Sequence, residues 1–350
     1  MGIEFKKRVE TSKFLDPTNN FTEKSFPIEF RYDPLTKDMG LVIEFRRRGE
    51  EKTDLSEVIA RSLQMGCPFC PESIEKVTPK FIPSLCSEGR IKIGEAVAFP
   101  NTMPYMSYSA VTVISSRHFL SLPEFTEDML ADAFLASQTY LRRVQEYDAN
   151  AKYWLITWNC MPPANSSQVH PHLQVFAAPL PLAHHQVLLD ASKKYRNESG
   201  TNYWSDFIAE ERRLQERYIA TIGNIVWLTS FVPRSLQLDV QAVFQDRKSL
   251  LSLSREDIES FCQGLTKIFK YMDDQNFYSF NLCFYSGVSG EDSFWTQAKL
   301  VQRGSHTPLH ISDVGNIQLL LDTQPCIKYP EEVCQELKAY FAQQGKNKEE

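Results

Sequence analysis

Long hydrophobic runs are absent from this chain of 350 residues. No stretch approaches the roughly 20 apolar residues of a transmembrane helix, and the first residues, MGIEFKKRVE, lack the apolar core of a secretory signal. The net charge of −6 supplies no basic surface for nucleic acid or an anionic membrane. These absences predict a cytoplasmic protein whose partners are neither nucleic acids nor membranes.

Glycine-rich phosphate loops, Walker motifs and dinucleotide fingerprints are also absent. The eight cysteines do not predict a disulfide framework, because no secretion signal accompanies them. Six are scattered singly, whereas Cys67 and Cys70 form the knuckle Cys-Pro-Phe-Cys. This spacing suits a structural metal. A redox pair is the alternative, although no βαβ pattern surrounds the knuckle.

The same order of expected strands and helices occurs twice along the chain. Two strands with a proline-containing turn, residues 96–116 and 224–245, each lead into a helix and a strand–loop–strand. The residues that recur at helical spacing on one face are Leu130, Phe134, Ser137, Leu141 and Val144 in the first helix, and Ile258, Phe261, Leu265, Ile268 and Met272 in the second. The repetition predicts an internally duplicated α+β fold, with antiparallel sheets and packed helices.

The expected N-caps of the two helices are Thr126 and Ser254, and Asp257 completes a capping box with Ser254. We place the boundary between the halves at residue 200, giving units 1–200 and 201–350. Aligning HFLSL with SLLSL sets Ser249 opposite His118. The second half would therefore keep the scaffold while the first half performs the chemistry.

The motif His-Pro-His-Leu-Gln at 170–174 supplies the chemistry-bearing residues. If this stretch is a strand, His170 and His172 lie on one face. Pro171 has no backbone N–H, which predicts an edge strand or a bulge. The corresponding region of the second half has Gln297 and Lys299, roughly opposite the two histidines. The alternative is that both histidines only cap or pair inside a packed sheet.

Two thiols and two imidazoles suit a tetrahedral zinc site, and Cys67, Cys70, His118 and His170 are the candidates. His172 would then stay free of metal and could act as a nucleophile. Gln174 points to the same side and could donate an amide N–H to phosphate, and the polar loop 165–168 carries no acid to repel it. The alternative is unrelated thiols, unrelated histidines and an ordinary polar turn.

The chain resembles the galactose-1-phosphate uridylyltransferase family, a branch of the histidine-triad superfamily. HPHLQ matches the family hallmark His-Pro-His-x-Gln, CPFCPESIEKVTP its zinc knuckle and SSRHFLSLPEFT the segment with a metal-binding histidine. RYDPLTKDMGLVI resembles its amino-terminal strand entry, and Asn159 lies eight residues before Ser167, as in the family. These matches cover residues 31–176. Through the duplication, the resemblance implies two histidine-triad-like halves.

The resemblance also implies roles for individual residues. Cys67, Cys70, His118 and His170 would bind one zinc ion, and His172 would attack the α-phosphorus of a nucleoside diphosphate compound. The residues that would contact the phosphates or the nucleoside are Arg46, Asn101, Thr102, Asn159, Ser167 and Gln174. Histidine-triad hydrolases have a third histidine where this chain has Gln174, so the resemblance implies transfer by double displacement between a nucleotide sugar and a sugar 1-phosphate.

Two departures from the family pattern are visible. The second half lacks the family's His-x-His pair, and Asn316 and Gln318 stand where the family has a hexose-binding glutamate. The alternatives are a phosphorylase, using phosphate with an ADP- or GDP-sugar or a dinucleoside polyphosphate, or a nucleotide-binding protein without catalysis. Since family members are often dimers, a homodimer is expected. We expect His184 and His185 at the surface.

Overall fold

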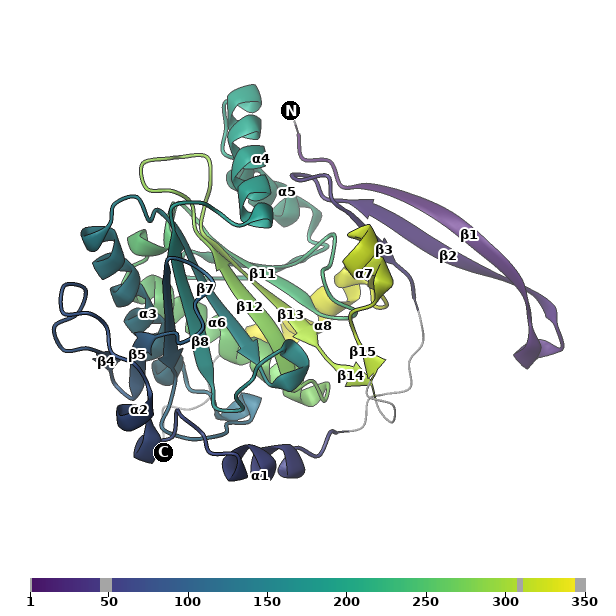
Figure 1. Ribbon diagram of the computed structural model, residues 1–350. Coiled ribbons are helices and arrows are strands. Elements are labelled where there is room, and N and C mark those ends of the chain that lie inside the picture. The colour runs from purple at the N-terminus through teal and green to yellow at the C-terminus, as the bar shows by residue number, and fades with distance from the viewer. Residues whose placement is uncertain (1, 45–51, 307–310, 344–350) are drawn as a thin grey trace.

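The computed structural model describes residues 2–44, 52–306 and 311–343. Its centre is a ten-stranded sheet in the order β4-β5-β6-β8-β7-β12-β13-β11-β10-β9 (Figure 1), and all neighbouring strands are antiparallel. The strands are β4 (Ile91–Ile93), β5 (Ala96–Pro100), β6 (Tyr108–Val113), β7 (Tyr153–Cys160), β8 (His172–Ala178), β9 (Tyr218–Ile222), β10 (Ile225–Thr229), β11 (Asp239–Phe244), β12 (Ser279–Tyr285) and β13 (Gln297–Arg303). The predicted α+β class is confirmed.

The strand order is the same from either end of the sheet to its middle. β4 to β8 come from the first half of the chain, β9 to β13 from the second, and the pair β7–β12 joins them. The predicted duplication of elements therefore takes the form of one continuous sheet rather than two. The division into 1–200 and 201–350 stays a prediction; that boundary falls between α4 (Ala183–Ser199) and α5 (Tyr203–Leu214).

Two long helices, α3 (Glu127–Tyr147) and α6 (Arg255–Asp274), pack on one face of this sheet. Every apolar-face residue predicted for them is buried, because the 3.6-residue period turns those side chains toward the strands. Thr126 and Ser254 are the N-caps, and Asp257 forms the expected capping box. No helix in the described ranges is both long and apolar enough to cross a membrane.

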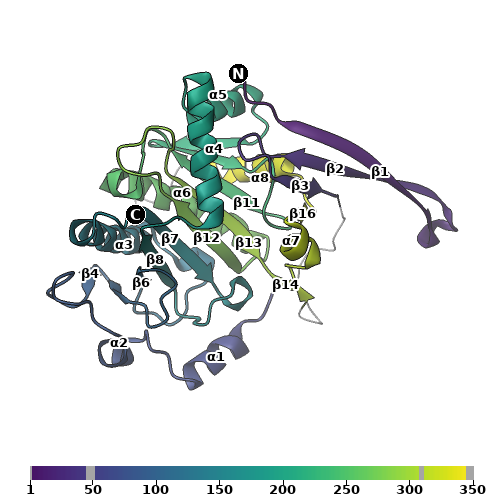
Figure 2. The ribbon, with the colours of Figure 1, turned by 45° about the horizontal axis from the view of Figure 1, so that its top comes forward.

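The opposite face of the sheet is covered only at its two flanks. α2 (Pro71–Val77) packs over β5 and β6, and α4 and α5 pack over β10 and β11 (Figure 2). Between these flanks, alternate residues of β12 and β13 are partly exposed while their neighbours are buried. We call this polar band on β8, β7, β12 and β13 the central strip. It is the part of this face whose side chains are partly exposed between the flanking helices.

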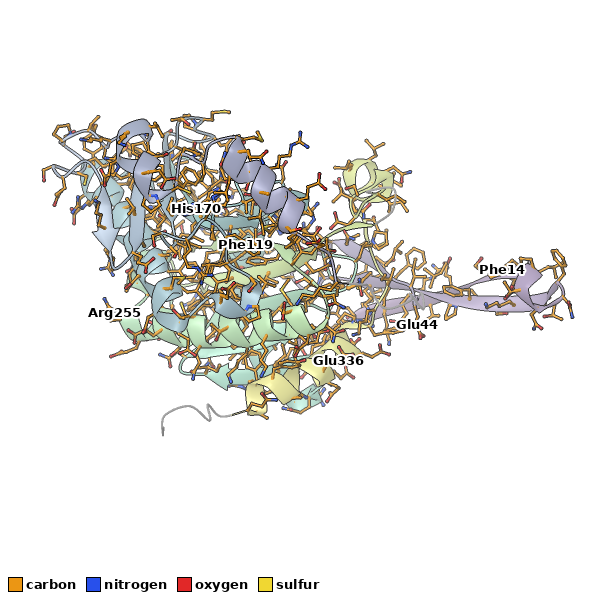
Figure 3. All side chains as sticks on the ribbon, turned by 90° about the horizontal axis from the view of Figure 1, so that it is seen from below. Phe14, Glu44, Phe119, His170, Arg255 and Glu336 are labelled. Atoms are coloured by element: carbon orange, nitrogen blue, oxygen red, sulfur yellow. The ribbon has the colours of Figure 1, made fainter. Side chains whose placement is uncertain are left out.

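A long β-hairpin projects from the body of the molecule (Figure 1). Its strands β1 (Lys6–Asp16) and β2 (Thr22–Tyr32) continue into a four-stranded sheet with β3 (Met39–Val42) and β16 (Gln324–Cys326). Phe14 lies near the tip, far from His170 in the body (Figure 3). The polar, mixed composition of roughly the first 60 residues predicts a turn at Asp33-Pro34 but no hairpin. The remaining elements are α1 (Ser56–Gln64), β14 (Ser305–His306), β15 (Ile311–Ser312), α7 (Asn316–Leu321) and α8 (Pro330–Ala342).

A buried ionic cluster ties the base of this hairpin to the second half. Arg217 donates to Glu211 at 2.8 Å and to Glu331 at 2.9 Å, and Arg31 of β2 also binds Glu331 at 2.9 Å. The charged pattern from about Ser205 through AEERRLQERYIA predicts a solvated packing helix that extends past residue 215. That prediction is wrong at its end, because α5 ends at Leu214 and Arg217 beyond it is paired in the interior.

Candidate functional site

The Cys-Pro-Phe-Cys knuckle lies directly before α2. Cys70 is the N-cap, with extended backbone, and Pro71 follows at the first helical position, where its missing N–H costs no hydrogen bond. His118 lies in the loop after β6, and His170 lies two residues before β8 begins. The fold thus brings four predicted residues from three separated segments together, and all their ligand atoms lie within 4.8 Å of one another.

The geometry of these four residues fits a tetrahedral metal ion. Cys67 Sγ lies 3.5 Å from His170 Nδ1, and Cys70 Sγ lies 3.4 Å from His118 Nδ1 and 3.7 Å from His170 Nδ1. Bonds of about 2.0–2.3 Å in a tetrahedron place the ligand atoms about 3.3–3.8 Å apart. Burial raises the pKa of Cys70 to about 12, so its thiolate needs a cation beside it.

The far nitrogen of each histidine has its own partner. His170 Nε2 donates to the backbone carbonyl of Ser115 at 2.8 Å, and His118 Nε2 lies 2.7 Å from Ser62 Oγ on α1. Ser62 donates its own proton to the Ile59 carbonyl, so its oxygen accepts from His118. Both Nδ1 atoms are left with lone pairs toward the sulfurs, as metal ligation requires.

His172 is the first residue of β8 and lies on the face that carries the central strip. Its Nδ1 donates to the backbone carbonyl of His170 at 2.8 Å, which leaves the lone pair on Nε2. Burial lowers the pKa of His172, so the ring is neutral near pH 7. The Phe69 ring, from within the knuckle, packs against it at a centroid distance of 5.1 Å.

The predicted edge position of this strand is wrong. β8 lies in the interior of the sheet between β6 and β7. Pro171 causes no bulge, because it comes before the first paired residue and contributes only its carbonyl, which accepts from the Ile114 amide at 3.0 Å. The missing N–H therefore falls where the ladder has not yet begun. Access to His172 comes from the face of the sheet rather than its edge.

The predicted phosphate-contacting residues differ in their placement. Thr157 of β7 pairs with Gln174 of β8, so Asn159, two residues after Thr157, and His172, two residues before Gln174, share the same face. Asn159 and Gln174 are partly exposed, and Ser167 is exposed in the loop that leads to β8. Asn159, His172 and Gln174 therefore lie together at one end of the central strip.

The remaining predicted contacts are less closely placed. Asn101 and Thr102 lie in the loop between β5 and β6, where Asn101 Oδ1 accepts from the Met103 amide at 2.9 Å. Arg46 lies outside the described residues. Sequence reasoning missed Ser62, Phe69 and Asn281.

The second half has no counterpart of the histidines, as predicted. β13 begins at Gln297 as β8 begins at His172, so Gln297 matches His172 rather than His170. Gln241 donates to the buried Gln297 side chain, and Lys299 pairs with Asp239 at 3.3 Å. Among the described residues, only the knuckle cluster groups three or more potential metal ligands.

Two further expectations need correction. Ser121 and Ser249 each precede a short 3-10 helix, η2 (Leu122–Glu124) and η4 (Leu250–Ser252), so Ser249 matches Ser121 and the predicted match with His118 is off by three residues. His185, expected at the surface, is buried on α4 and its Nε2 donates to the Ser286 carbonyl at 2.6 Å. His184 is partly buried beside Arg234.

No protein-family model matches this chain. A protein of Archaeoglobus fulgidus described as uncharacterized is 28% identical over 342 residues, which cover 97% of this chain and all of that protein. A GalT-like protein from Arabidopsis thaliana superposes with a TM-score of 0.68 at 16% identity, covering 89% of this chain and 98% of the other.

Two other solved structures are similar to the same extent. An ADP-glucose phosphorylase from Arabidopsis thaliana with bound ADP-glucose has a TM-score of 0.69, and a uridylyltransferase has a TM-score of 0.65, each at 16% identity. Both cover 89% of this chain and 98% and 97% of their own chains. The molecule therefore has a duplicated α+β fold with a single continuous sheet. More specifically, it has the fold of the GalT-like proteins, as the sequence resemblance predicted.

Proposed function

We propose that this chain is a nucleotidyltransferase that works by double displacement through a nucleotidyl-histidine at His172. The observation that carries the proposal is the single free nitrogen of that ring. Nδ1 is held by the His170 carbonyl, and no described residue hydrogen-bonds Nε2. The donor we propose is a nucleoside diphosphate sugar and the acceptor a sugar 1-phosphate. Gln174, Asn159 and Ser167 would contact the phosphates, and Asn101, Thr102 and Arg46 the remainder of the donor.

The reaction requires two displacements at one phosphorus atom. In the first, the Nε2 lone pair of His172 forms an N–P bond with the α-phosphorus, and the P–O bond to the leaving sugar 1-phosphate breaks. In the second, a phosphate oxygen of the acceptor attacks the same phosphorus and the N–P bond breaks. The His170 carbonyl, which accepts the Nδ1–H of His172, stabilises the positive charge that the ring carries in between.

We propose zinc as the ion held by Cys67, Cys70, His118 and His170, because two thiolates and two imidazoles close its tetrahedral shell. When bound, the ion would hold the four ligand-bearing residues together, and it would have no open coordination position. His170 connects this cluster with the chemistry, since its ring faces the sulfurs while its carbonyl orients His172. Phe69, between the two cysteines, packs against the His172 ring from the side.

A phosphorylase that uses inorganic phosphate as acceptor is the second candidate. One segment aligns with the part of the family that carries the hexose-binding glutamate. Among the described residues of this segment, no carboxylate is left without a side-chain partner. Gln318 accepts from the Gly315 amide at 2.9 Å and so caps α7, and Asp313 binds Arg303 through both oxygens at 2.8 and 2.9 Å. A small acceptor with no sugar needs no such carboxylate.

The test is a mass measurement on the intact protein. We expect zinc-loaded protein, incubated with UDP-, ADP- and GDP-sugars or dinucleoside polyphosphates and quenched at alkaline pH, to gain one nucleoside monophosphate. The adduct should be absent from His172→Ala, and its discharge by sugar 1-phosphate or by inorganic phosphate separates the two candidates. If no donor gives an adduct, the chain is instead a nucleotide-binding protein.

We propose a cytoplasmic setting for this protein. All eight cysteines are free thiols in the structure, as expected of a chain in the reducing cytoplasm. The partners we propose are therefore small phosphorylated metabolites. The homodimer stays a prediction from the resemblance.

A further inference from the structure

A line of hydrogen bonds runs from the second half of the molecule to Asn159. Asp313 binds Arg303 through both carboxylate oxygens at 2.8 and 2.9 Å. Arg303 Nη1 donates to Asn281 Oδ1 at 2.7 Å, and Asn281 Nδ2 donates to Asn159 Oδ1 at 2.8 Å. We call these four residues the amide relay. They link β13 and β12, from the second half, to β7 of the first.

The chemistry of the donors dictates which way each amide faces. A guanidinium has only donors, so the atom of Asn281 that meets Arg303 must be its oxygen. The NH₂ group of Asn281 then faces Asn159, and the atom of Asn159 that meets it must also be an oxygen. This assignment follows from hydrogen-bond logic alone, and the bond from Asn281 Nδ2 to the Ala164 carbonyl at 2.9 Å agrees with it.

One group remains at the end of the relay, the NH₂ group of Asn159. Among the described residues it has no hydrogen-bond partner, and it lies on the central strip beside His172. We infer that Asn281, Arg303 and Asp313 are positioning residues, which hold Asn159 with its NH₂ donor toward the phosphate of the substrate. This inference rests on the proposed function, because it presumes a phosphate at that place.

Asn281 also holds the loop that carries Ser167. Ala164 ends the short helix η3 (Pro162–Ala164), and the bond from Asn281 fixes this end of the loop. Asn165 follows in a left-handed conformation, with φ of 67°, so the chain turns at that point. One side chain of the second half therefore positions two proposed phosphate contacts of the first, and the active half is incomplete without the other.

The sharpest test replaces Asn281 by aspartate, which has the same shape and no NH₂ group. The new carboxylate could still accept from Arg303, but its second oxygen would face Asn159 and turn that amide round. The carbonyl of Asn159 would then meet the phosphate. We expect Asn281→Asp to slow formation of the His172 adduct by at least about 100-fold, the loss that follows removal of one donor to a developing charge.

Two comparisons separate positioning from a general structural effect. Asn197→Asp makes the same change at an exposed position on α4, away from the relay, and we expect less than about a twofold change. In an Asn159→Ala background, Asn281→Asp should cost no more than about threefold further, because only its contact with the Ala164 carbonyl remains to be lost. Arg303→Lys keeps a donor and should retain more activity than Arg303→Met.

The outcomes are distinct. Thermal unfolding and zinc content should match wild type in each variant, and the dissociation constant for ADP should rise in Asn281→Asp. If wild-type protein and Asn281→Asp form the adduct equally fast, this inference alone is overturned. It is also overturned if the rate loss of the double variant equals the product of the losses of Asn159→Ala and Asn281→Asp. Wild-type protein that neither forms an adduct nor binds ADP would overturn the proposed function, and with it the relay's purpose.

Discussion

The two halves of the molecule share an order of strands and helices but differ at the first residue of one strand. β8 begins with His172, whose Nε2 is left free, whereas β13 begins with the buried Gln297. On the second half, Gln241 contacts Gln297 and Lys299 pairs with Asp239, so the matching surface is occupied by internal contacts. On the proposed function, the comparison teaches that duplication here separated two tasks, chemistry in the first half and support in the second.

The halves also differ in how they join distant segments. In the first half, the knuckle cluster brings together residues 67–70, 118 and 170, which suits a metal ion. In the second half, Arg217 and Arg31 meet Glu331 and so tie the hairpin to α8 without a metal. These two junctions therefore join distant segments by different chemistry.

Moving the imidazole between halves gives the largest expected effect. In the double variant His172→Ala, Gln297→His, we expect transfer to fall by at least about 10⁴-fold, as losing a nucleophile does. The histidine at 297 would lack the carbonyl contact and the Asn159 amide that serve His172. The measurement is adduct formation by intact mass, with Gln297→Ala as the control that should stay active. An adduct on residue 297 would show that the halves are chemically interchangeable.

Breaking the ionic cluster should have the next largest effect, on stability. Arg217 is 1% exposed, so Arg217→Met leaves Glu211 buried without a partner and should lower the free energy of unfolding by about 3–5 kcal/mol. Urea titration measures the change. The matched control is Arg213→Met, which removes an exposed pair with Glu210 and should cost at most about 1 kcal/mol. Equal costs for the two variants would contradict the idea of a buried junction.

Ser62→Ala should weaken the metal junction without removing a ligand. The hydroxyl accepts from His118 Nε2 and orients the ring, and loss of such a partner lowers metal affinity by about 10–100-fold. Competition with a coloured chelator measures the affinity for zinc directly. Ser56→Ala, at the start of the same helix, should leave it unchanged. An unchanged affinity in both variants would mean that the Ser62 contact does not orient His118.

The helix caps give the smallest effect, and only one half should show it at acid pH. Burial alone would raise the pKa of Asp257, but hydrogen bonds from Arg247 and the Ser254 amide hold it below the ordinary 3.8. Stability from this carboxylate is therefore present above about pH 4 and is lost as the pH falls through the lowered pKa. We expect Asp257→Asn to cost about 1–2 kcal/mol at pH 7 and to flatten the decline below pH 4.

The corresponding cap of α3 provides the control for this titration. The Thr126 hydroxyl accepts from the Met129 amide at 3.2 Å and does not titrate. Thr126→Ala should therefore cost about 1 kcal/mol, and the same amount at every pH. Urea unfolding between pH 7 and pH 3 measures both variants. A pH-dependent loss in Thr126→Ala would remove the difference between the two halves.

Local sequence patterns predicted most of the fold. Helical periodicity identified the buried faces of α3 and α6, and the repeated element order indicated the duplication before the sheet was seen. Such local patterns do not predict which distant strands pair, so β8 was wrongly expected at an edge. The hairpin was missed for a related reason, because β1 is exposed along nearly its whole length and has no two-residue alternation.

The residues of the candidate site also divide into those that a sequence pattern predicts and those that it does not. Cys67 and Cys70 were recognisable because their spacing is local and typical of a metal site. His118 and His170 were chosen by residue type as the imidazoles that complete such a site, and the resemblance implied the same role for them. Ser62 and Asn281 act across folds of the chain, at sequence separations of 56 and 122 from the residues they contact. An isolated serine on a helix or asparagine in a strand has no such spacing, so only the three-dimensional arrangement identifies it.

The pairing of β7 with β12 has a consequence for how this protein can change over generations. On the proposed function, the strip that bears His172 and Asn159 lies along that seam, so a substitution in either half would reach the same substrate. The second half has Gln297 where the first has His172, yet without the second half the edge of β7 would lose its partner strand. The hydrogen bonds between β7 and β12 therefore favour keeping the two halves in one polypeptide chain.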